Sequence, residues 1–92
     1  MAKIVSVKPL ENYKIFVEFS DGLKGELNLK HLLKRKEYEK LNDLNVFNSV
    51  RIDAKTKDII WDGGMNICKV AVYNMLELKN EMKKLKIDLN RL

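Results

Sequence analysis

The chain has little of what disulfides, metal clusters and membrane spans require. Cys68 is the only cysteine and His31 the only histidine among 92 residues. No intrachain disulfide and no cysteine-based zinc cluster can therefore form, which is typical of a reducing compartment. No apolar run approaches the roughly 18 residues that a membrane helix needs. With one proline and four glycines, the composition is also not that of a fibrous or low-complexity protein. We expect a cytoplasmic protein that neither spans a membrane nor carries a cofactor.

The remaining composition is that of one small globular domain. Hydrophobic residues make up 46% of the chain and charged residues 34%, which is sufficient for a single core at this length. The formal charge is +5, so an acidic partner such as nucleic acid is a candidate. That excess is divided as +2, +1 and +2 over residues 1–43, 44–76 and 77–92, and no single basic stripe is predicted.

Hydrophobic alternation predicts strands over residues 3–8, 13–19, 23–27, 50–53 and 58–61. The turn residues Ser20-Asp21-Gly22 join the second and third of these into a hairpin. Asn28 is a helix-capping residue, and a short helix is expected over about 29–36. For residues 37–49, leucines and aromatics spaced by three suit a second helical turn or a compact connection. The fold class is α+β: a small, mostly antiparallel sheet of about five strands, one short helix packed on it, and a C-terminal amphipathic helix. Residues 1–76 form the domain and residues 77–92 extend it.

From residue 68 onward the apolar residues recur at alternating spacings of three and four, as in a coiled-coil heptad. In this numbering Glu81 falls at a g position and Lys86 at the e position that faces it in a parallel pair. Two interpretations stay open: the helix self-associates, or it packs its apolar stripe on its own sheet. Leu89 and Leu92 lie beyond the reach of a small sheet, and self-association through them would give a homodimer. The candidate self-association residues are Met75, Leu78, Met82, Leu85, Leu89 and Leu92, continuing the pattern of Cys68 and Ala71.

A second set of residues forms a pattern along the chain: a strand ending in Phe-x-Asp-Gly, a Leu-rich helix, a Leu and a Phe further on, a strand ending in Trp, a glycine turn and a Tyr. The residues of this pattern are Phe19, Asp21, Gly22, Leu29, Leu32, Leu33, Leu41, Phe47, Trp61, Gly64 and Tyr73. The pattern resembles that of a known family of small bacterial domains, domain-of-unknown-function family 2442.

The resemblance covers about residues 3–73 and implies a compact α+β domain without an established activity. It also implies a module that is sometimes joined to DNA-binding domains or encoded beside toxin-like partners. The chain departs from the family at Asn66, where an acid is usual, and at Lys69, where a proline is usual. A family role that depends on that acid does not carry over to this chain.

Few residues suggest chemistry, and each has a structural interpretation. His31 and Cys68 lack the partners that a general base, a nucleophile or a metal site needs; we expect His31 to be structural or solvent-facing and Cys68 to lie in the core. Asp53 and Asp58 flank a turn, Asp62 precedes a strand exit, and Trp61 and Tyr73 suit packing. We therefore predict no catalytic, metal or cofactor site.

Two functions remain from the sequence. The first is a non-catalytic protein-interaction or regulatory module, antitoxin-like in one form, that acts through an unidentified partner protein. The second is a nucleic-acid-binding module that uses a basic patch. Cations at the end of a helix also stabilise the helix itself, so the patch does not require a partner. The patch consists of Lys30, Lys34, Arg35, Lys36 and Lys40.

Overall fold

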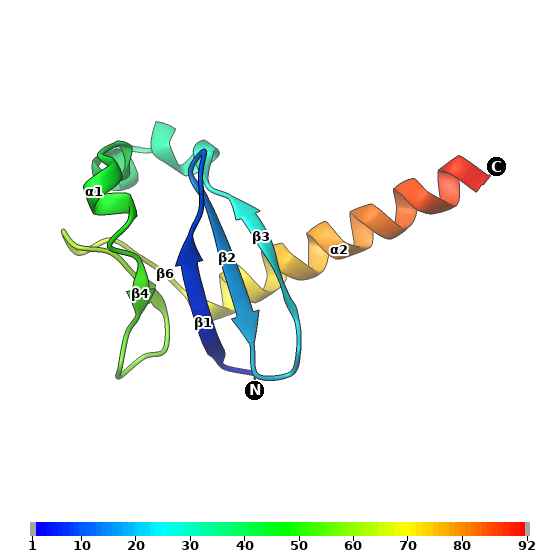
Figure 1. Ribbon diagram of the computed structural model, residues 1–92, viewed down its shortest axis with the longest axis horizontal. Helices are drawn as coiled ribbons and strands as arrows, with labels where there is room; N and C mark the ends of the chain where they lie inside the picture. The colour runs from blue at the N-terminus through cyan, green and yellow to red at the C-terminus, as the bar shows by residue number, and fades with distance from the viewer. Residues whose placement is uncertain (1, 92) are drawn as a thin grey trace.

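The computed structural model describes the backbone of residues 2–91 and the burial of side chains in residues 2–81 (Figure 1). Its strands are β1 Ile4–Pro9, β2 Lys14–Phe19, β3 Lys24–Asn28, β4 Arg51–Ile52, β5 Ile59–Ile60 and β6 Asn66–Ile67. Its helices are the 3-10 helices η1 Lys30–Lys34 and η2 Lys36–Asn42 and the α-helices α1 Leu44–Phe47 and α2 Lys69–Arg91. The predicted α+β class is confirmed.

The first sheet has the order β1-β2-β3, with both pairs antiparallel. The predicted hairpin over residues 13–27 is confirmed: Val17 pairs with Gly25, and the amide of Phe19 donates to the carbonyl of Leu23 at 2.8 Å. Gly22 has φ +94°, which costs glycine nothing. At the same turn the Asp21 carboxylate accepts from the amide of Leu23 at 3.0 Å.

The prediction of a single sheet of about five strands is wrong. Strands β4, β5 and β6 form a separate three-stranded antiparallel sheet that stands beside β1 (Figure 1). Strands β4 and β5 lie within the strands predicted over 50–53 and 58–61, but each strand of this second sheet has only two residues, and the sequence pattern does not say which strands they pair with. Strand β6 was not predicted at all, because Gly63 and Gly64, both with positive φ, turn the chain back on β5 only a few residues after that strand ends.

The short helix predicted over about 29–36 is present as the 3-10 helix η1 Lys30–Lys34. The Asn28 side chain accepts from the amide of Lys30 at 2.9 Å, but the N-cap of η1 is Leu29, so the predicted capping role of Asn28 is wrong. Leu29 and Leu32, three residues apart, are both buried, and a spacing of three suits the three residues per turn of a 3-10 helix. The expectation of a helical or compact connection over 37–49 is confirmed by η2 and α1.

The core lies between the inner face of the first sheet, the second sheet and the first turns of α2. Trp61 is only 2% exposed, and its indole nitrogen donates to the carbonyl of Phe47 at 3.2 Å. From α2, Val72 and Leu76 are fully buried; Leu76 lies so close to β3 that a Cβ at Gly25 would be 3.2 Å from it. The predicted packing role of Trp61 is confirmed.

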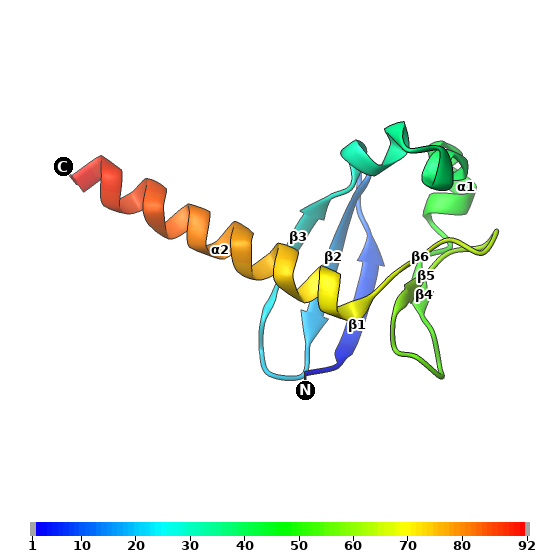
Figure 2. The ribbon, with the colours of Figure 1, turned by 180° about the vertical axis from the view of Figure 1, so that it is seen from behind.

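Helix α2 gives the molecule its elongated shape. It contains 23 residues, about 34 Å at 1.5 Å per residue, and its second half projects away from both sheets (Figures 1 and 2). The longest extent of the molecule is accordingly 47 Å, against 29 and 19 Å in the other directions. Within the described residues, no helix is both long and apolar enough to cross a membrane.

Candidate functional sites

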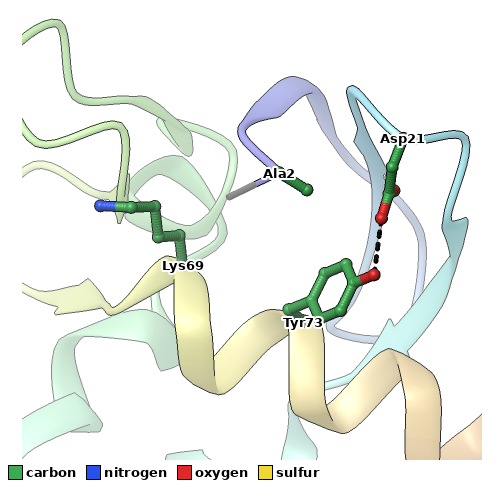
Figure 3. Close-up of a pocket in the computed structure, with 4 residues that line it drawn as sticks. All are labelled: Ala2, Asp21, Lys69 and Tyr73. Atoms are coloured by element: carbon green, nitrogen blue, oxygen red, sulfur yellow. Dashed lines mark hydrogen bonds between the residues drawn. The ribbon is translucent and has the colours of Figure 1, made fainter.

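A small notch forms where the β2–β3 turn meets the start of α2 (Figure 3). The Tyr73 hydroxyl donates to the Asp21 carboxylate at 2.5 Å, although 52 residues separate the two in sequence. The Tyr73 ring also stacks edge-on against Phe19, with centroids 4.9 Å apart. Three residues of the family pattern therefore meet here, and they join the hairpin to the helix.

The electrostatics of this pair favour a structural bond over acid–base chemistry. The hydrogen bond from Tyr73 lowers the pKa of Asp21 below its ordinary value. The same bond to Asp21 raises the pKa of Tyr73. A carboxylate with a lowered pKa is a weaker base, and a phenol with a raised pKa stays protonated, so near neutral pH neither is well placed for proton transfer.

Lys69 lines the same notch but is directed elsewhere. Its ammonium group donates to the carbonyl of Thr56 at 2.8 Å and lies 3.8 Å from the Asp58 carboxylate, and in Figure 3 it extends away from Asp21 and Tyr73. Asp58 also accepts from the amide of Lys69 at 2.9 Å. The positive end of α2 is thus already occupied by a carboxylate of this chain.

The three aspartates around the second sheet are held apart by separate local bonds. The Asp53 side chain accepts from the amide of Lys55 at 3.2 Å and from the Thr56 hydroxyl at 2.8 Å, as predicted for a turn. Asp62 pairs with Arg51 at 2.8 Å. Among the described residues no group of three potential ligands could hold a metal ion.

The predicted basic patch is divided between two hollows of the surface. Lys36 and Lys40 border a hollow of about 500 Å³ together with Glu37 and Glu39. Arg35 borders a different hollow. All five cations of the patch are exposed, yet the acidic neighbours interrupt the continuous positive track that a phosphate backbone prefers.

The C-terminal seam is only partly covered by the fold. Met75 is half-buried, whereas Leu78 is 59% exposed, so the interpretation that this stripe packs on its own sheet is wrong for Leu78. The inward face is instead formed by Val72 and Leu76, one step round the helix. Side chains at the seam positions Met82, Leu85, Leu89 and Leu92 lie outside the described residues.

Cys68 and His31 do not form a reactive centre. Cys68 is exposed, and the expectation that it lies in the core is therefore wrong: Cys68 lies just before α2, which begins at Lys69. His31 is exposed on η1, which agrees with the solvent-facing alternative predicted for it.

A hollow of about 460 Å³ between η1 and the start of α2 was not predicted from the sequence. We call it the η1–α2 groove. Leu32 and Ile67 are buried and form its floor, while Met75 and Tyr38 are half-buried. The groove is defined by these four residues together with Ala71, His31 and Arg35. The seam positions Ala71 and Met75 were the only signal in the sequence for it, since the other lining residues come from distant segments.

Comparison with known proteins places this α+β domain in a family. Residues 4–75 match the family model described as a protein of unknown function, DUF2442, and the chain belongs to that family. The match spans both sheets, the notch residues Asp21, Lys69 and Tyr73, and the η1–α2 groove, and ends at Met75 within α2. No curated protein and no solved structure matches the chain.

Proposed function

We propose that this chain is a non-catalytic protein-interaction module, regulatory or antitoxin-like, that self-associates through the outward face of α2. The single observation that carries the proposal is Leu78, a large apolar side chain that is 59% exposed on a helix whose second half projects away from both sheets. The heptad pattern continues from that residue through 82, 85, 89 and 92 in the sequence. An apolar seam on a projecting helix is the usual basis of a two-stranded coil.

The chemistry of the rest of the surface supports a binding role rather than an enzymatic one. The strongest pair of polar side chains among the described residues is Asp21 with Tyr73. Their hydrogen bond lowers the pKa of Asp21 and raises the pKa of Tyr73, which favours the ionised carboxylate and the protonated phenol. Other charged contacts cap α2, close a turn or link neighbouring segments of the fold. Catalysis requires several polar groups that converge on a reactant, and a binding module does not.

A matched pair of variants tests self-association. Leu78→Glu places a charge in the seam, and Leu44→Glu places the same charge at a leucine that is 58% exposed on α1. We expect light scattering to give a dimer mass for the unaltered chain and for Leu44→Glu, and a monomer mass for Leu78→Glu. A monomer mass for the unaltered chain at all concentrations rejects self-association.

The second candidate is a nucleic-acid-binding module. It is favoured by one observation, the exposure of all five patch cations on η1 and η2. Binding to single-stranded or duplex oligonucleotides would then weaken steeply as salt rises, and replacement of Lys34 and Lys36 by alanine would reduce the salt slope by about two. No binding at low salt rejects this candidate.

A further inference from the structure

We propose that the η1–α2 groove binds a short acidic, amphipathic segment of a partner protein. The segment inserts two or three apolar side chains between η1 and α2 and sets its carboxylates against Arg35. The inference rests on the proposed function, because it names the class of partner that the interaction module takes. It concerns a surface separate from the outer half of the seam.

The first observation is the apolar character of the groove. Leu32 and Ile67 provide a buried floor and Met75 a flexible side wall. The volume of about 460 Å³ falls within the range of roughly 300–1,000 Å³ that ligand pockets occupy. Methionine at such a site adapts its shape to different apolar side chains. The groove therefore suits inserted apolar anchors.

The second observation is that the groove is held open by the fold. The Tyr38 hydroxyl donates to the carbonyl of Asn66 at 3.1 Å, which fixes the η2 side of the groove to β6. On the other side, Leu76 is fully buried and anchors the turn of α2 that carries Ala71 and Met75. A pre-formed groove binds a segment without the entropy cost of ordering its own walls.

The third observation is charge. Arg35 and His31 are exposed at the border of the groove, and no acidic residue lines it. Within the residues whose side chains are described, Arg35 takes part in no ion pair. Lys34 adjoins Arg35 and is also exposed. A segment bearing Glu or Asp beside its apolar anchors complements this border, and its association would be steered by the positive field.

Charge and shape also distinguish this occupant from two others. A second copy of the chain would bring residues 77–92, which carry five basic and three acidic side chains, toward an already positive border. Nucleic acid would need several cations along a track, but Lys36 and Lys40 border the other hollow, with Glu37 and Glu39. The apolar floor would in addition leave a sugar–phosphate backbone without hydrogen-bond donors.

The test uses the full-length chain and synthetic peptides of 14 residues. One peptide carries leucines at positions i, i+3, i+4 and i+7 with glutamate elsewhere; a second has lysine in place of glutamate; a third has serine in place of leucine. Fluorescence anisotropy gives the affinities, and NMR amide shifts give the location. We expect the acidic peptide to bind at least about tenfold more tightly than either control, with the largest shifts at Ile67 and Ala71.

Two pairs of variants separate groove binding from general electrostatics. Arg35→Glu and Lys24→Glu change the net charge equally, but Lys24 lies on β3, outside the groove. We expect Arg35→Glu to weaken the acidic peptide about tenfold or more and Lys24→Glu to change it less than about threefold. At the exposed position Ala71, Ala71→Glu and Ala71→Lys add side chains of similar length; only Ala71→Glu should abolish binding.

The contrary results distinguish failure of the groove proposal from failure of the proposed self-association. Equal affinity for the acidic and lysine peptides removes the charge argument, and equal effects of Arg35→Glu and Lys24→Glu remove the site. Displacement of the acidic peptide by a single-stranded oligonucleotide that shifts the same amides assigns the groove to nucleic acid instead. If the acidic peptide does not bind while the chain still forms a dimer, the groove proposal is rejected and self-association is not. A monomeric chain that binds the peptide rejects self-association alone.

Discussion

Replacing Trp61 with phenylalanine should destabilise the fold without altering its association. The indole is 2% exposed, and its nitrogen is the donor to the Phe47 carbonyl at 3.2 Å. Phenylalanine cannot make that bond, but the Phe47 carbonyl still accepts from the amide of Val50 at 3.3 Å, so the lost bond costs about 0.5–1.5 kcal/mol. The smaller ring also leaves a cavity in the core. We expect a total loss of about 1–3 kcal/mol in the free energy of unfolding.

The assay is urea unfolding followed by far-ultraviolet circular dichroism, since Trp61 is the only tryptophan and its fluorescence is lost in the variant. The midpoint should fall while the dependence on urea stays unchanged. Tyr38→Phe is a suitable control, because it removes a hydroxyl that donates to the Asn66 carbonyl at 3.1 Å from a half-buried ring. Its effect should be clearly smaller.

The magnitude makes the experiment decisive. A chain of this length has a total stability of about 5–14 kcal/mol, so the expected loss is a large fraction of it. A loss below about 1 kcal/mol would lie in the range of ordinary substitutions. It would show that the aromatic residue of the family pattern is not needed for packing, and Trp61 would have to be reconsidered as part of a binding site.

Two further predictions concern the junction between the hairpin and α2. Because the bond to Tyr73 lowers the pKa of Asp21, its contribution to stability is present above the ordinary value of 3.8 and is lost as pH falls through the lower folded value. Because the pKa of Tyr73 is raised, the contribution of the Tyr73 hydroxyl to stability is present below pH 10.0 and is lost as pH rises through the higher folded pKa. The difference in unfolding free energy between the unaltered chain and Tyr73→Phe should therefore shrink at both low and high pH. A difference that is independent of pH contradicts the bond. On α2, Leu76→Ala should lower the free energy of unfolding by about 2–5 kcal/mol, whereas Leu78→Ala should lower it by less than about 1 kcal/mol. Both are measured by urea unfolding at concentrations where the chain is monomeric. Equal losses would contradict the conclusion that Leu76 faces inward and Leu78 outward.

Local features of the fold follow from local sequence. The hairpin over residues 13–27 combines strict alternation with a turn at Asp21 and Gly22, and neither signal depends on distant residues. The Asn28 and Asp53 side chains bond to amides two positions ahead, so their identity alone is informative. Burial of Trp61 follows from the apolar run that it ends.

Features that depend on distant contacts could not be predicted in this way. The division into two sheets depends on the pairing of strands of two residues, and the alternation within a strand does not identify its partner strand. On α2 the stripe through Val72 and Leu76 and the stripe through Ala71, Met75 and Leu78 are both apolar at helical spacing. Only the packing of α2 against Gly25 of β3 determines which stripe faces inward.

The candidate sites show the same limit. The seam was visible because its members lie on one helix, and the family pattern supplied Asp21 and Tyr73 without revealing that they touch. The η1–α2 groove draws its walls from η1, η2, β6 and α2. No spacing in the sequence relates these four elements, because their proximity is a product of the tertiary fold.

The most direct test of the interaction module is charge reversal across the seam. In a parallel pair, Glu81 faces Lys86 of the second copy by heptad position. Sedimentation equilibrium should show weaker dimers for Glu81→Lys and for Lys86→Glu, and recovery of the dimer in the double variant that carries both changes. A mass that stays monomeric in the unaltered chain, or single and double variants that dimerise alike, would contradict self-association through α2.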